Sequence, residues 1–308
     1  MERLDLRIDP SAYEGYAKFC RLLGYRVEIT PSGLWIGKGG NAVFQRVPPC
    51  VTQSPHPSDL SSLIEKRAAV AMLYAVPPGQ RGGTGYVNII RKRHFGLDDL
   101  ASGSRRWDVR KGLRHCTVRR MSFGELQQAG AALNRETLAR QRRRDPWFDS
   151  PAAWERFCSA GNEVDSVEVC GAWVDDVLAA YAVGIQVGPV FNGLYHMSRT
   201  ALMDKNPSSA LYFTIVSQKM ASPGVELVCA GSSFRSTAGV DRFKERMGFE
   251  RAPVTVRLDV RWPLQILIGS DLANGVLNRV APWLIGKDRS HTLLEMMNLA
   301  RLSSASAQ

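Results

Sequence analysis

The heptapeptide MDKNPSS, centred on Asn206, combines residue types that can bind a phosphate group. Asn206 is a favoured N-cap residue, and Pro207 suits the first position of a helix. The first N–H groups of a helix lack partners and its dipole is positive there, so a helix start attracts anions. Lys205 adds a positive charge, while Ser208 and Ser209 add hydroxyl donors. The pattern indicates either an anion site or a plain N-cap, because every helix has such a beginning.

Other catalytic and metal-binding patterns are missing from the chain. No GxSxG elbow is present, which argues against a Ser-His-Asp triad. The five histidines form no HExxH pair, and the six cysteines show no CxxC spacing, so no metal site is predicted. Widely spaced cysteines of this kind predict buried thiols in a reducing cytoplasm. The Gly-rich stretch 80–85 (QRGGTG) precedes a strand rather than a helix, so it is interpreted as a flexible turn.

Positive charge is concentrated in one sixth of the 308 residues. The stretch 91–144 holds fifteen Lys and Arg against five Asp and Glu, a net charge of +10, and the whole chain carries +11. A local basic field attracts a polyanion such as nucleic acid, a phosphate-rich cofactor or an acidic membrane surface. A solvated basic helix face explains the same composition, and both interpretations stay open.

The first half of the chain reads as a mixture of short helices and strands. A helix over 11–23 ends at Gly24, and Pro31-Ser32-Gly33 connects two strands of a hairpin. A Pro/Ser-rich loop is expected over 48–59, followed by strands over 68–76 and 85–91. A basic helix is expected over 97–114.

The second half has clearer signals. Ser122 and Glu125 have capping-box spacing, which predicts the start of a helix that runs to about Arg144. Asn192-Gly193 predicts a hairpin turn between strands over 177–191 and 194–202. Further strands are expected over 116–121, 164–174, 225–230 and 254–260, with helices over 151–160, from 206, and ending at Gly248.

This order of one strand, two helices, three antiparallel strands, helix, strand, helix and strand resembles the GNAT acyltransferase fold. The resemblance rests on NPSSALYFTIVSQKMAS (206–222), the following strand with Gly231, and FKERMGF (243–249). RKGLR (110–114) and FKERMGF are similar to segments of the FemAB-like branch, which includes cellulose-biosynthesis-associated acetyltransferase-like proteins. The likeness covers about residues 60–260. It implies an α/β (α+β) fold with a mixed, mostly antiparallel sheet flanked by helices, in a tandem of a short degenerate unit and a full unit.

The resemblance implies a site where an amine or hydroxyl attacks an activated carbonyl. His196, on the fourth strand of the full unit near its V-shaped opening, is the base candidate, although it also fits a sheet histidine. Ser233, after the fifth strand, is the candidate donor to the leaving group, although it also fits a turn cap. Lys205, Asn206, Ser208 and Ser209 occupy the position that holds the donor's pyrophosphate in GNAT enzymes.

The donor implied by the resemblance is acetyl-CoA or another acyl-CoA, with aminoacyl-tRNA as the alternative. The GNAT phosphate signature (Arg or Gln, two residues, Gly, one residue, Gly or Ala) is absent at 203–209, which weakens acetyl-CoA. FemAB peptide-bridge enzymes use aminoacyl-tRNA, and the basic stretch 91–144 would hold a tRNA backbone by counterion release. The long inserted helical hairpin of those ligases is not found here. The cations of 140–144 also suit the negative end of a helix without any ligand, which favours acyl-CoA.

These observations predict three regions: a degenerate GNAT-like unit over 1–112, an acyltransferase domain over 113–262, and a C-terminal helical extension over 263–308. Apolar residues recur at helical spacing in 263–286, which fits a packed helix or contact with a membrane surface. The N-terminus has no signal-peptide h-region, so a cytoplasmic location is expected. The predicted function is acyl transfer to a small-molecule or cell-envelope precursor. The alternative is a non-catalytic GNAT-fold module that uses 91–144 to bind nucleic acid or a protein.

Overall fold

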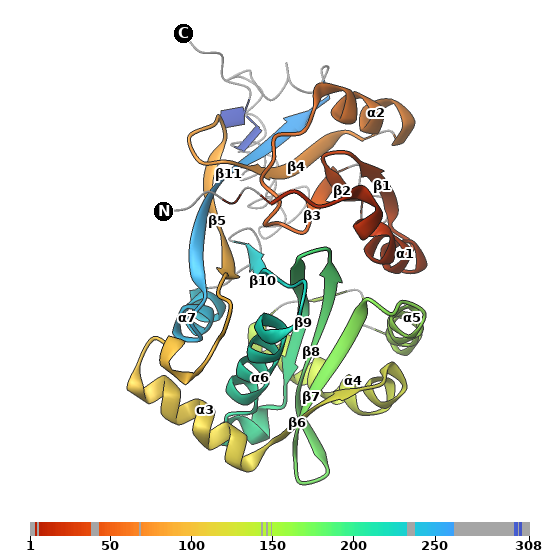
Figure 1. Ribbon diagram of the computed structural model, residues 1–308. Helices are drawn as coiled ribbons and strands as arrows, with labels where there is room; N and C mark the ends of the chain where they lie inside the picture. The colour runs from red at the N-terminus through yellow and green to blue at the C-terminus, as the bar shows by residue number, and fades with distance from the viewer. Residues whose placement is uncertain are drawn as a thin grey trace, which may run out of the picture. The chain divides into compact units, whose positions relative to one another are not determined.

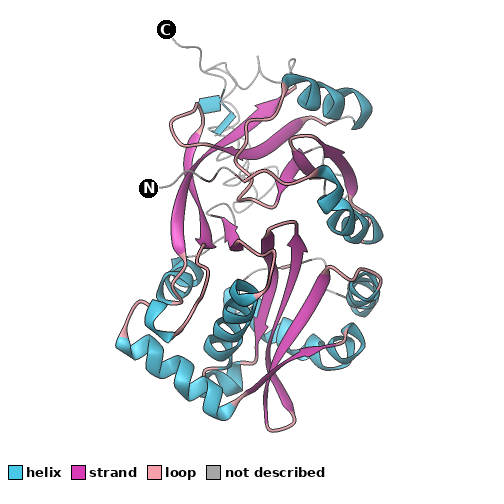
Figure 2. Ribbon diagram, viewed as in Figure 1, coloured by secondary structure: helices cyan, strands magenta, loops and turns pink. Residues whose placement is uncertain are grey.

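The computed structural model describes most of the chain, as shown in Figures 1 and 2. The described residues are 4, 6–37, 43–67, 69–142, 144–145, 147–148, 150–232, 238–261, 299–300 and 302–303. Two compact units are formed, and their ranges interleave along the sequence. The first comprises 1–10, 25–87 and 252–308, and the second comprises 11–24 and 88–251. The predicted boundary after residue 112 falls inside a helix of the second unit, and most of the predicted extension 263–308 lies outside the described residues.

The first unit is built on a mixed sheet. Its strands lie in the order β1 (Arg26–Thr30), β2 (Gly33–Gly37), β3 (Val43–Val47), β4 (Ala71–Val76), β11 (Glu250–Val260) and β5 (Gly83–Ile90). The hairpin predicted across 31–33 is confirmed, with Thr30 opposite Gly33. Helix α2 (Pro57–Arg67) packs on this sheet through Leu63, which joins Trp35, Phe44 and Met72 in the core. Residues 57–59, expected in a loop, therefore form the first turn of α2.

The second unit has the predicted order of elements. It begins with β6 (Thr117–Met121), α4 (Phe123–Gln141) and α5 (Pro151–Asn162), and continues through β7 (Val167–Val174), β8 (Val177–Val187) and β9 (Val190–Ser198). It ends with α6 (Pro207–Ala221), β10 (Leu227–Ser232) and α7 (Ala238–Arg246), which leads into β11. The sheet order is β10-β9-β8-β7-β6, antiparallel except for the parallel pair of β9 and β10. Two further helices, α1 (Glu14–Leu22) and α3 (Gly103–His115), belong to this unit.

Side chains alternate across this sheet, so that both faces are covered by helices. On β8, Ala180 faces the cluster that contains Leu211 of α6. Its neighbour Tyr181 points to the opposite face, where its hydroxyl donates to Asn134 Oδ1 of α4 and its ring lies 6.4 Å from that of Trp154 on α5. The protein thus has an α+β fold with a large, mostly antiparallel sheet flanked by helices, as predicted.

The Asn192-Gly193 hairpin prediction is wrong. Both residues lie inside β9, where Asn192 pairs with Ile185 and Gly193 with Gly184 of β8. The chain turns four residues earlier, at Gly188, whose φ of 53° allows a tight connection between Val187 and Val190. Pairing along the whole of β8 outweighs the local preference of Asn-Gly, and the ladder instead changes register beside Gly193. The strand predicted to Leu202 ends at Ser198, and the 3-10 helix η3 (Thr200–Lys205) follows.

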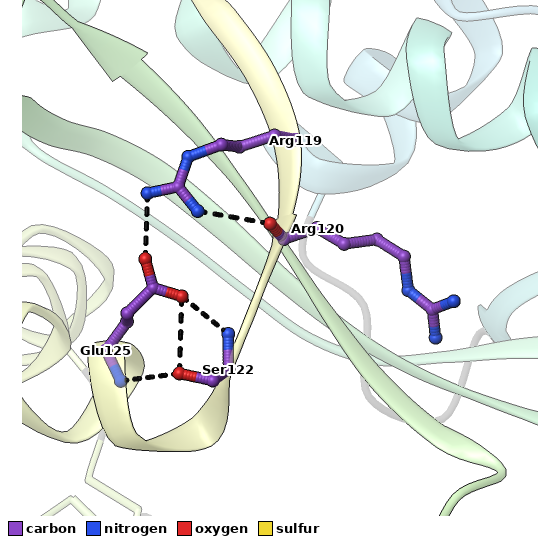
Figure 3. A network of polar contacts seen from close by, with 4 residues as sticks. All are labelled: Arg119, Arg120, Ser122 and Glu125. Carbon is purple, nitrogen blue, oxygen red and sulfur yellow. Dashed lines mark hydrogen bonds and ion pairs between the residues drawn. The ribbon is translucent and has the colours of Figure 1, made fainter.

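The start of α4 confirms the predicted capping box (Figure 3). Ser122 Oγ accepts from the N–H of Glu125 at 3.1 Å, and Glu125 Oε2 accepts from the N–H of Ser122 at 2.7 Å. Arg119 donates to the other carboxylate oxygen at 2.8 Å. The hydrogen bond from Arg119 and the backbone hydrogen bond from Ser122 lower the pKa of Glu125 to about 2. The charged carboxylate thus anchors the connection from β6 to α4.

Candidate functional site

The paired strands β9 and β10 part from each other near the middle of β9. They pair in parallel over three residues, from Leu227 opposite Val190 to Cys229 opposite Asn192. Beyond this point β9 continues to Ser198 and β10 to Ser232, and in the described part of the chain these segments do not pair with each other. At the far end of β9, Thr137 of α4 hydrogen-bonds both the N–H and the carbonyl of Ser198, so an extended ligand could use only the backbone groups between this residue and the parting. This parting is the V-shaped opening expected near His196.

His196 lies on β9 beyond the parting, on the face that carries α6 and α7. Its ring is 5.0 Å from that of Tyr212 on α6 and stacks on Phe243 of α7 at 6.5 Å. Its Nε2 atom is buried and has no hydrogen-bond partner among the described residues. Burial, with a smaller contribution from the nearby charge of Arg140, lowers the pKa of His196 to about 4. The imidazole is therefore neutral at pH 7. Its Nε2 atom can donate or accept a hydrogen bond with a ligand, and its neighbours are aromatic side chains.

The start of α6, where a phosphate was expected, is covered by α3 of the same unit. Asn206 has a left-handed conformation with φ of 55°, and its Nδ2 lies 3.5 Å from Asp108 Oδ1 of α3. Asp108 also pairs with Arg105 at 3.0 Å, and Arg105 Nη1 lies 3.4 Å from Ser209 Oγ. A Cβ placed on Gly112 would lie 2.6 Å from the carbonyl oxygen of Asn206. Glycine at this position allows α3 to approach the first turn of α6 closely.

The backbone of this turn offers little to an anion. Pro207 has no N–H, and the N–H groups of Ser209 and Ala210 both donate to the carbonyl of Asn206, at 3.1 and 3.2 Å. Ser208 is left to supply an N–H to a ligand. Lys205 pairs with its neighbour Asp204 at 3.3 Å. Because a pyrophosphate is normally bound by several converging N–H groups, this helix start is a poor cradle for a CoA donor.

A buried lysine, not singled out in the sequence, lies at the end of β10. Ser233 itself is outside the described residues, but a Cβ placed on the nearby Gly231 would lie 3.7 Å from Lys244 Nζ of α7. Lys244 is 7% exposed, and burial lowers its pKa, opposed by the carboxylate of Asp241 and by Cys229. The four-residue spacing from Val240 to Lys244 already placed this lysine beside the apolar stripe of its helix.

Asp241 connects Lys244 to a buried amide. Asn88 Nδ2 of β5 lies 3.3 Å from Asp241 Oδ1, and both residues are buried. The Oδ1 atom of Asn88 is buried without a hydrogen-bond partner among the described residues. A buried polar group of this kind incurs a desolvation cost unless something satisfies it, which makes this end of β10 a second candidate for ligand contact.

The cysteines do not supply a nucleophile. All six are buried. Burial raises the pKa of Cys116 and Cys170 to about 11 and that of Cys158 to about 12, so these thiols stay protonated near neutral pH. No group of three or more His, Cys, Asp or Glu that could hold a metal ion occurs among the described residues.

Comparisons with known proteins find structural rather than sequence similarity. No family model matches the chain, and no curated protein matches it. The structure of FemX superposes with a TM-score of 0.59 at 13% identity, covering 87% of this chain and all of FemX. The C-terminal domain of an Agrobacterium fabrum protein described as a lysylphosphatidylglycerol synthetase gives a TM-score of 0.55 at 13% identity, over 79% of this chain and 86% of that domain. The chain therefore shares the fold of FemX and of this C-terminal domain.

Proposed function

We propose that the protein transfers an aminoacyl group from tRNA to an amine or hydroxyl of a cell-envelope precursor. The observation that carries this proposal is the parting of β9 and β10. The unpartnered Nε2 of His196 lies beyond the parting on β9, and Lys244 of α7 lies beside the end of β10. Two proteins with similar folds support the substrate class, because one is FemX and the other is described as a synthetase of an aminoacylated phospholipid.

The start of α6 supports tRNA over CoA as the donor. In this chain Asp108 lies beside Asn206. The carbonyl of Asn206 already accepts hydrogen bonds from two N–H groups of the first turn of α6. Asp108, although paired with Arg105, competes with a pyrophosphate for the side chain of Asn206 at this helix start. An aminoacyl-tRNA presents its reactive ester at the 3′ end of a long polyanion, so it can be held by basic residues elsewhere and needs no pyrophosphate site.

The proposed reaction is an attack by the acceptor's amine or hydroxyl on the ester carbonyl of the aminoacyl-tRNA. The acceptor's nitrogen or oxygen forms a bond to the carbonyl carbon, and the carbon–oxygen bond to the tRNA ribose breaks. Neutral His196 would accept the acceptor's proton at Nε2 and return it to the departing ribose oxygen. Lys244, as an ammonium, would stabilise the negative charge that develops on the carbonyl oxygen.

The test is a donor comparison with purified full-length protein. Radiolabelled aminoacyl-tRNAs and radiolabelled acetyl-CoA are each offered with a pool of UDP-linked muropeptides and phosphatidylglycerol vesicles, and label transfer is measured. We expect transfer from at least one aminoacyl-tRNA, reduced by about 100-fold or more in His196→Gln and in Lys244→Met. Lys205→Gln, at the covered helix start, is the matched control and should keep its rate. Transfer from acetyl-CoA alone would refute the donor assignment.

The covering of the α6 start also favours a second candidate, a non-catalytic module. A GNAT fold whose phosphate position is occupied by its own Asp108 and Asn206 can hold a ligand without turnover. The same experiment distinguishes the two, since a module would bind tRNA without ever discharging it, and its binding would be unchanged in His196→Gln.

A further inference from the structure

Large apolar side chains are exposed on two neighbouring elements of the second unit. Trp107 is 54% exposed and Leu113 is 42% exposed, both on α3, and Met203 on η3 is 48% exposed. The end of η3 lies against the end of α3, because Cys116 Sγ lies 3.8 Å from the carbonyl oxygen of Lys205. Among the described residues only five large hydrophobic side chains are exposed to this extent, so three of them occur on α3 and η3. Such a grouping indicates an interaction surface.

Four cations share the exposed part of α3 with Trp107 and Leu113. The inward face carries Arg105, Val109 and Gly112, all buried in the contact with α6. The outward cations are spaced at one helical turn or one residue apart: Arg106, Arg110, Lys111 and Arg114. In the described part of the chain none of these four is ion-paired, and the acidic residue of this helix, Asp108, pairs with Arg105 instead. Lys111 Nζ lies 5.1 Å from the ring centroid of Trp107.

We propose that this surface, defined as Trp107, Leu113, Met203 and the four outward cations of α3, docks the protein on an anionic lipid bilayer. Lipid phosphates attract the cations, while an indole and aliphatic side chains partition into the interface between headgroups and acyl chains. A row of basic residues on one helix face is the pattern that binds anionic lipids. Figure 1 shows α3 beside α6 at the border of its unit.

The apolar groups favour a bilayer over a nucleic acid. An RNA backbone would use the four cations, and Trp107 could stack on a base, but Leu113 and Met203 gain nothing from phosphate or sugar. Asp204, beside Met203, opposes an anionic surface, although it is paired with Lys205. The described residues contain no helix long and apolar enough to cross a membrane. The proposed contact is with the surface of a membrane. This inference does not depend on the proposed acyl transfer.

The experiment is sedimentation of the full-length protein with sucrose-loaded vesicles of phosphatidylcholine alone or with 30% phosphatidylglycerol. We expect binding to the anionic vesicles only, weakened by added salt. Removing three cations together should lower the partition coefficient by about 100-fold, since each contributes roughly five-fold at an anionic surface. The triple variant carries Arg110→Gln, Lys111→Gln and Arg114→Gln. The control variant removes three exposed cations outside α3 and should bind like the wild type; it carries Arg7→Gln, Arg81→Gln and Arg135→Gln.

A second pair of variants tests the apolar part of the surface. Trp107→Ser with Leu113→Ser should lower vesicle binding by about ten-fold or more, whereas Leu302→Ser, an equally exposed apolar residue elsewhere, should not. Circular dichroism verifies that each variant is folded. The proposal is overturned if neutral and anionic vesicles bind equally or if neither binds. It is equally overturned if the triple variant loses tRNA binding in a filter assay while vesicle binding is absent, which would make α3 an RNA surface.

Discussion

His196 should make the protein sensitive to mild acid. Its pKa is about 4 in the folded protein, chiefly because the ring is buried, whereas an unfolded histidine has a pKa of about 6.5. Above pH 6.5 the ring is neutral in both states, so the folded state has its full stability. As the pH falls from 6.5 toward 4, the unfolded chain binds a proton that the folded chain does not, and the free energy of unfolding decreases.

The size of this effect follows from the two pKa values. Their difference corresponds to about 3 kcal/mol in total, and about 2 kcal/mol of it is lost between pH 7 and pH 4.5. The assay is urea denaturation of wild type and His196→Gln at both pH values. The wild type should lose about 2 kcal/mol more than the variant over this interval. His115→Gln, an exposed histidine on α3, is the control and should follow the wild type.

The comparison can refute the argument in two ways. If the wild type and His196→Gln lose the same stability between pH 7 and pH 4.5, His196 does not titrate differently in the folded and unfolded states. If the imidazole proton resonances of His196 titrate near pH 6.5 in the folded protein, the ring is solvated. Its candidate role as a base whose Nε2 atom is buried and unpartnered would then be wrong as well.

Three substitutions test the contacts that position the site. Gly112→Val should destabilise the protein by about 1–3 kcal/mol in thermal unfolding, because a side chain there collides with the carbonyl of Asn206 and separates α3 from α6. Ser122→Ala should cost about 1 kcal/mol in urea denaturation, because the first turn of α4 loses its cap. Tyr181→Phe should cost about 1–3 kcal/mol in the same assay, because Asn134 Oδ1 loses its buried donor.

Each of these substitutions has a matched control or a contradicting result. Gly103→Ala, where a Cβ meets only an arginine tip at 3.8 Å, should leave stability within about 0.5 kcal/mol of the wild type. Equal stability of Gly112→Val and the wild type would contradict the close approach of α3 to α6. For Ser122→Ala, an unchanged midpoint would show that the cap contributes nothing. For Tyr181→Phe, the control is the double variant that also carries Asn134→Leu. If the double variant regains stability, the loss in Tyr181→Phe comes from the unsatisfied Asn134 side chain and not from packing.

The order of elements in the second unit was predictable from the sequence because its signals are local. The capping box of Ser122 and Glu125 depends on two residues three positions apart. The end of α7 depends on Gly248, whose φ is 85°. The N–H of Gly248 donates to the carbonyl of Glu245, and the N–H of Phe249 donates to that of Lys244. Such bonds form within one turn of chain, so residue type and spacing suffice to predict them.

Tertiary structure decided the features that depend on residues far apart in the sequence. Asn192 and Gly193 became part of β9 because pairing with β8 along the whole strand forms more backbone hydrogen bonds than a local turn at Asn-Gly would. Lys244 lies near Gly231 of β10, and its neighbour Asp241 contacts Asn88 of β5. Neither β10 nor Asn88 has a fixed sequence spacing from Lys244, so residue spacing could not predict these contacts.

The covering of the α6 start by α3 is of the same kind. Arg105 reaches Ser209 across 104 residues, and Gly112 matters only because Asn206 lies against it. The sequence by itself determined that a helix begins at Asn206 with the residue types of an anion site. The tertiary structure decided that α3 packs against this helix start, because the close backbone contact at Gly112 and the contact of Asp108 with Asn206 join residues about 100 positions apart.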